Sequence, residues 1–130
     1  MAHPKMFEDD DPYLLRVRKL ATAFPESAEK VSHGRPAFYT RKVFAYYGGS
    51  LKDDGVWVEH PHSLVLLPEA DERFALLADP QVFVPAYLGP SGWVGIDLDE
   101  DTDWTEIGEL LEVSYRLTAP KASITQLDSS

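Results

Sequence analysis

Apolar positions recur at spacings of three and four near both ends of the chain, which is the pattern of amphipathic helices. The first stripe follows Asp11 and Pro12, a capping acid and then a proline at the first helical position. Pro25 ends this predicted helix, because the residue before a proline is pushed out of the helical region. The stripe itself consists of Leu14, Val17, Ala21 and Phe24.

The second stripe lies near the C-terminus and begins at Asp103. Asp103 and Glu106 have the spacing of a capping box, and Pro120 closes the predicted helix. The inner face of this helix consists of Ile107, Leu110, Leu111 and Ser114, with Leu117 or Thr118 extending it.

Between these helices, runs rich in β-branched and aromatic residues alternate with turn residues, as in antiparallel strands. Gly48-Gly49 is predicted to end one strand and Asp54-Gly55 to form the next turn. A short helix is predicted over residues 69–77, with Phe74 facing inward. The predicted strands cover residues 28–32, 37–40, 42–47, 56–59, 63–67 and 93–98. Together these elements predict an α+β fold of two layers, in which an antiparallel sheet packs with helices.

The length of 130 residues predicts a single domain with one hydrophobic core. We place this core at residues 12–121, between a flexible leader over residues 1–9 and a flexible tail over residues 122–130. The absence of cysteine excludes disulfides and thiolate sites. No apolar run approaches the roughly 18 residues of a membrane span, and the N-terminus lacks the apolar core of a signal peptide. We therefore expect a cytoplasmic protein that does not associate with membranes.

The net charge of −10 is distributed unevenly along the chain. Residues 1–65 hold nine basic and nine acidic side chains, whereas residues 66–130 hold three basic and thirteen acidic ones. The second half would therefore repel a polyanion. Residues 30–49 contain four basic side chains, five aromatic ones and no acid, so this segment is the place where a nucleic acid would bind.

The basic segment gives one functional hypothesis, the binding of DNA through strand hairpins. About five phosphate contacts would give a modest and strongly salt-dependent interaction. The candidate contacts are Lys30, Arg35, Arg41, Lys42 and Lys52, with Tyr39, Tyr46 or Tyr47 as stacking groups. The alternative is a solvated strand face whose aromatic side chains pack in the core or against neighbouring strands.

The turn Ser32-His33-Gly34-Arg35 gives a second hypothesis. Adjacent residues on an extended strand point to opposite faces, which argues against a catalytic serine–histidine pair. His33 and Arg35, together with Tyr39, could instead line a pocket for an anionic small molecule. The acidic surface elsewhere would also suit a basic protein partner.

Two further motifs are explained more simply as structural. The motif His60-Pro61-His62 has no evident third metal ligand. The acids from Asp97 to Asp103 lack the central glycine and the terminal glutamate of a calcium loop. Because the sequence contains no nucleotide-binding motif and no catalytic set, we expect a non-enzymatic protein without cofactors. The alternative, an enzyme, would need a concave pocket that joins His33 and Arg35 to a carboxylate.

Five segments within roughly residues 12–121 carry recognisable motifs: SHGRPAFY at 32–39, KVFA at 42–45, VPAYLGPSGWVGIDLD at 84–99, DW at 103–104 and SYRLTAPK at 114–121. In order and spacing these motifs resemble the MmcQ/YjbR family. The resemblance implies a helix–strands–helix–strands–helix topology, similar to that of the type III secretion chaperones. It also implies DNA binding through a double-wing motif, and it supplies no catalytic residues.

Two positions depart from the pattern of this family. Ser91 occupies a loop position where a lysine is common, and Glu59 and His60 stand where a basic residue is frequent. Both departures remove positive charge from the face that the resemblance assigns to DNA.

Overall fold

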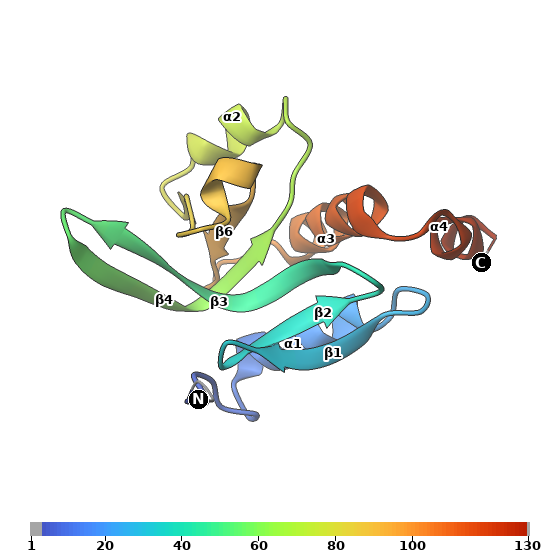
Figure 1. The fold of residues 1–130 in the computed structure, drawn as a ribbon, viewed down its shortest axis with the longest axis horizontal. Coiled ribbons are helices and arrows are strands. Elements are labelled where there is room, and N and C mark those ends of the chain that lie inside the picture. The colour runs from blue at the N-terminus through green and yellow to red at the C-terminus, as the bar shows by residue number, and fades with distance from the viewer. Residues whose placement is uncertain (1–3, 130) are drawn as a thin grey trace.

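A six-stranded antiparallel sheet organises the chain, and helices pack against one of its faces (Figure 1). The computed structural model describes residues 4–129. The strands are β1 (Ala28–Ser32), β2 (Arg35–Tyr39), β3 (Val43–Asp53), β4 (Val56–Leu66), β5 (Val82–Phe83) and β6 (Val94–Asp97). Their order in the sheet is β1-β2-β3-β4-β6-β5, and all neighbours pair antiparallel. The predicted α+β class is confirmed, and the first four strands form an antiparallel meander.

The α-helices of the described chain are α1 (Pro12–Ala21), α2 (Arg73–Leu77), α3 (Trp104–Thr118) and α4 (Lys121–Asp128). Asp11 and Asp103 cap α1 and α3, each accepting hydrogen bonds from two backbone N–H groups of the first turn. Over residues 4–129, none of the helices has the length and apolar character needed to cross a membrane.

The core fills the space between the sheet and the helices α1 and α3. An aromatic cluster closes one end of it, where Phe24 stacks on Tyr115 with ring centroids 4.8 Å apart. Phe44 meets both of these rings edge-on, at 5.9 and 5.5 Å. The buried sheet residues of the core cluster are Phe38, Phe44, Ala45, Tyr47, Leu64, Leu66, Val94, and Ile96.

The opposite face of the sheet carries a second row of side chains. The strand register pairs Tyr46 with Val65, Val65 with Gly95, and Gly95 with Phe83. Phe83 lies across the sheet because Gly95 has no side chain, and a Cβ at Gly95 would sit 2.2 Å from the tip of the phenyl ring. We call this side, opposite α1 and α3, the open face.

Two predicted strand boundaries are wrong. Strand β3 does not end at Gly48-Gly49 but continues to Asp53, because Gly48 adopts a φ of +86° in a bulge that keeps the pairing with β4. Strand β4 joins two predicted strands through Pro61, whose missing N–H falls in an irregular stretch of the ladder. Figure 1 shows the resulting long β3–β4 hairpin projecting from the sheet. The short strand β5 was not among the predicted elements.

The predictions for α2 and for the chain ends also need correction. Helix α2 begins at Arg73, and the side chain of Phe74 is 83% exposed instead of facing inward. Most of the predicted tail forms α4, and Ser130 lies outside the described residues. Of the predicted leader, residues 1–3 lie outside the described chain, while the N–H of Met6 donates to the carbonyl of Gly34 at 2.8 Å. The leader is thus attached to the β1–β2 turn.

Candidate functional site

A cavity of about 470 Å³ opens on the open face, where β3 extends beyond its last pairing with β2. The far wall of this pocket comes from the segment after β5, and it is fixed by a hydrogen bond from the N–H of Ala86 to the carbonyl of Ser50 at 2.8 Å. Its volume lies within the roughly 300–1,000 Å³ of small-molecule sites. The lining residues are Ser32, His33, Arg35, Tyr46, Gly48, Gly49, Ser50, Val65, Pro85, Ala86, Tyr87 and Leu88.

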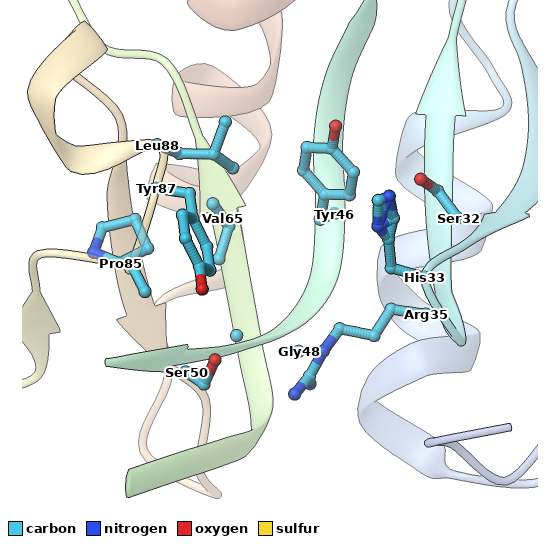
Figure 2. A pocket seen from close by; sticks show the side chains of 12 residues that line it. Ser32, His33, Arg35, Tyr46, Gly48, Ser50, Val65, Pro85, Tyr87 and Leu88 are labelled. Carbon is cyan, nitrogen blue, oxygen red and sulfur yellow. The ribbon is translucent and has the colours of Figure 1, made fainter. Parts of the chain in front are cut away.

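Figure 2 shows how these side chains are arranged. Residues of the β1–β2 turn and the start of β2 form one wall, the segment from Pro85 to Leu88 forms the opposite wall, and Tyr46 stands between them on β3. The pocket therefore combines an apolar wall with one cationic side chain, Arg35. None of the residues that line it within the described chain is acidic, although the whole protein carries 22 acidic side chains.

Arg35 is held in place by the backbone of β3. Its side chain extends from β2 toward Gly48 (Figure 2), and a Cβ at Gly48 would lie 2.4 Å from the Nη1 atom of Arg35. The Nη2 atom donates to Glu59 of β4 at 2.5 Å. Within residues 4–129, Nε and Nη1 have no side-chain or carbonyl acceptor. The guanidinium group is thus fixed in orientation and largely buried, and its Nε and Nη1 donors are available to a ligand.

Two residues of the pocket rim have unusual backbone conformations. His33 has a φ of +52° and Tyr87 a φ of +66°, both in the left-handed region that non-glycine residues seldom adopt. Tyr87 is 84% exposed and lies 6.0 Å from Trp57 between ring centroids. Left-handed residues of this kind persist where the surrounding structure holds them, and they cluster at ligand sites. Burial also raises the pKa of Tyr46, which therefore stays a neutral phenol.

The structure brings together only part of the predicted anionic-ligand pocket. His33 and Arg35 line one cavity, as the sequence predicted. Tyr39 does not line it, and its ring instead lies 4.7 Å from the ammonium group of Lys30. Tyr46 and Tyr87 provide the aromatic walls in its place, and Tyr87 reaches the site from a segment that is 52 residues beyond Arg35 in the sequence. The prolines and glycines around Tyr87, such as Pro85 and Gly89, are the sequence signal for an irregular loop there.

The five predicted nucleic-acid contacts are distributed over three places in the sheet: the β1–β2 hairpin, the β2–β3 turn and the tip of the β3–β4 hairpin. Lys52 lies 5.7 Å above the ring of Trp57, near the tip of the β3–β4 hairpin. Arg41 and Lys42 are exposed in the β2–β3 turn and form no ion pair within residues 4–129. Lys30 lies on the edge strand β1, and Arg35 is already paired with Glu59.

Of the three tyrosines predicted to stack on bases, Tyr47 is excluded. Its side chain is 1% exposed and belongs to the core. Burial and a hydrogen bond to Asp11 raise its pKa far above the ordinary value for tyrosine. Tyr46 faces the pocket and packs against Trp93, with ring centroids 5.9 Å apart.

The histidines of the His60-Pro61-His62 motif each contact an aspartate from a distant part of the chain. His60 lies 2.7 Å from Asp97 of β6 and stacks on the ring of Phe83 at 3.9 Å. The Nδ1 atom of His62 lies 2.9 Å from Asp11 at the start of α1. Within residues 4–129, no three His, Cys, Asp or Glu side chains are arranged to hold a metal ion. The motif thus connects β4 to β6 and to α1.

Asp11 has a buried carboxylate with several hydrogen-bond donors. It caps α1 and accepts a hydrogen bond from the hydroxyl of Tyr47 at 2.5 Å, in addition to the contact with His62. Burial acts to raise the pKa of Asp11, but these hydrogen bonds and that from the N–H of Tyr13 outweigh it, so the pKa lies below its ordinary value. The sequence identified the cap and did not reveal its tertiary partners.

The acidic segment before α3 also has structural roles. Asp99 accepts hydrogen bonds from the N–H of Asp101 and from the side chain of Gln81, both at 2.9 Å. Asp103 caps the helix. These contacts agree with the interpretation of this segment as a turn and a helix cap.

These observations define the protein as a two-layer α+β protein whose open sheet face contains a ligand-sized pocket with one arginine. A family model described as YjbR matches residues 22–117, and the chain belongs to the YjbR family. No curated protein matches the chain.

Two solved structures have a similar fold. The Deinococcus radiodurans protein DR2400, with domain family DUF419, is 24% identical with a TM-score of 0.61, over 98% of this chain and 92% of that one. A protein from Pseudomonas syringae is 13% identical with a TM-score of 0.59, over 83% of this chain and 98% of that one. At these identities the likeness concerns the fold.

Proposed function

We propose that this YjbR-family protein is a binding module for a small amphipathic anion, which occupies the pocket on the open face. The observation that carries the proposal is Arg35, a largely buried cation with unused donors in a pocket lined by no acid. Tyr46, Tyr87 and the aliphatic residues beside them would cover the apolar part of the ligand. A buried arginine next to apolar walls recognises a carboxylate by charge-assisted hydrogen bonds.

The test is calorimetric titration with benzoate, octanoate and the neutral analogue benzyl alcohol. We expect the anions to bind the wild type and benzyl alcohol to bind more weakly. Because a hydrogen bond to a charged group contributes about 1.5–3 kcal/mol, Arg35→Gln should weaken benzoate binding roughly 10- to 100-fold. Arg41→Gln is the matched control, since it removes an exposed arginine outside the pocket. Equal affinities for the two variants, or no binding by the wild type, would contradict the proposal.

The second candidate function is the weak, salt-dependent binding of DNA. It is favoured by Arg41 and Lys42, which lie exposed without an ion pair in the described chain, and by Lys30 and Lys52, each above an aromatic ring. Pairing of Arg35 with Glu59 and the acidic hairpin tip next to Lys52 reduce the number of contacts.

A DNA-binding assay at several salt concentrations tests this second candidate. Each neutralised phosphate contributes about 0.9 to the slope of log affinity against log salt. The double variant Arg41→Ala, Lys42→Ala should therefore bind more weakly and lower the slope by roughly 2. The candidate fails if wild-type protein does not bind DNA at low salt, or if the double variant keeps the wild-type slope.

A further inference from the structure

The ion pair between Arg35 and Glu59 lies beside the pocket and joins two different hairpins. Arg35 comes from β2 and Glu59 from β4, 24 residues later. The two partners differ in exposure, because the side chain of Arg35 is 12% exposed and that of Glu59 is 50% exposed. Glu59 can therefore turn into water with little loss of solvation, whereas Arg35 cannot leave the pocket without opening it.

The position of Arg35 does not depend on Glu59 alone. The guanidinium lies over the backbone of Gly48, in the space that any larger residue would fill. Its carbon chain passes along the pocket wall in Figure 2. Arg35 would thus remain in place after Glu59 leaves, with one more donor directed toward a new anion.

We infer that Glu59 is an internal competitor for Arg35, which a bound carboxylate ligand displaces. The inference rests on the ligand site proposed above. The guanidinium fork matches a carboxylate in geometry, and Glu59 is itself a carboxylate that already occupies one side of it.

A displaced Glu59 would still oppose the binding of an anion. It stays nearby, because its backbone pairs with Ser50, a residue that lines the pocket. At that distance its negative charge repels a bound anion, so removing the charge should strengthen binding.

The exchange should also change the environment of Trp57 at the pocket rim. Trp57 lies on the same strand as Glu59, two residues away, and packs against Tyr87 of the opposite pocket wall. Movement of Glu59 and entry of a ligand beside Tyr87 would change the surroundings of the Trp57 indole. The indole N–H resonance of Trp57 is thus a second readout.

The test compares Glu59→Gln with the control Glu109→Gln in titrations with benzoate and phenyl phosphate at pH 8. Both substitutions remove one negative charge, but Glu109 is an exposed residue on α3 and does not line the pocket. Because Glu59 is half exposed to solvent, its ion pair with Arg35 should contribute at most about 1 kcal/mol, and removing the competitor should raise benzoate affinity up to about 5-fold. The affinities for benzoate and phenyl phosphate should both rise in Glu59→Gln and keep their wild-type values in Glu109→Gln.

Each outcome decides the inference. If benzoate binds the wild type and Glu59→Gln binds it equally or more weakly, Glu59 is not a competitor, although the pocket remains a ligand site. The same conclusion follows if both variants tighten binding equally, since the effect then comes from net charge. If neither benzoate nor phenyl phosphate binds the wild type or Glu59→Gln, both the inference and the ligand site are wrong. Stronger binding of benzoate by Glu59→Gln alone, with a shifted Trp57 resonance on titration, supports the exchange.

Discussion

Replacing Asp11 with alanine separates the capping role of this residue from its tertiary role. Loss of a helix cap costs about 1 kcal/mol, within a range of about 0.5–2. Asp11 also accepts a hydrogen bond from Tyr47, whose side chain is 1% exposed. Losing this hydrogen bond to a carboxylate, with only the Nδ1 atom of His62 left near the hydroxyl at 3.2 Å, adds roughly 1–3 kcal/mol. The expected loss in the free energy of unfolding for Asp11→Ala is therefore about 2–4 kcal/mol.

Asp103→Ala is the matched control. Asp103 caps α3 through the equivalent two backbone bonds, but its side chain is exposed and, within residues 4–129, contacts no buried hydroxyl. The Asp103→Ala substitution should lower the free energy of unfolding by only about 1 kcal/mol. Urea denaturation of both variants measures the difference, with the midpoint and slope recorded for each. Equal destabilisation by the two substitutions would show that the contact with Tyr47 contributes nothing, and the reasoning about Asp11 would be refuted.

Two further predictions concern the same cluster and the sheet. The depressed pKa of Asp11 means that its stabilisation is complete above the ordinary carboxyl pKa of about 4 and is lost as the pH falls through the lower folded-state pKa. The stability difference between wild type and Asp11→Asn should thus shrink between pH 5 and pH 2 in urea denaturation, and a constant difference would contradict it. Gly95→Ala should destabilise by about 1–3 kcal/mol, because the new Cβ overlaps the ring of Phe83. Gly108→Ala on α3, where the nearest atom is 4.0 Å away, should be neutral or stabilising by up to about 1 kcal/mol, and similar thermal shifts for the two variants would contradict the account.

Local signals predicted the helices better than the strands. The cap at Asp11 and the apolar stripe that follows it are interactions between neighbours in the sequence, and both appear in the structure. The course of β3 through Gly48 depends on β4, a partner that lies further along the chain, so the local sequence predicts a break at this pair of glycines. Helix α4 has no side-chain cap among the described residues and only a weakly apolar face, so little in the local sequence predicts it.

The candidate site was predicted only in part for the same reason. His33 and Arg35 lie within one turn, and the sequence identified them together. Tyr87 and Glu59 approach Arg35 through the fold, from the segment after β5 and from β4. Which of the tyrosines faces the pocket is decided by the strand register, which buries Tyr47 and leaves Tyr46 on the open face.

The most direct test of the ligand site is a benzoate titration of isotope-labelled wild-type protein, followed by amide resonances in NMR spectra. We predict saturable shifts that cluster at the pocket, from Ser32 to Arg35, at Gly48 to Ser50 and at Ala86 to Leu88, while the resonances of α3 and α4 stay unchanged. An absence of shifts at saturating benzoate, or shifts confined to residues outside the pocket, would contradict it.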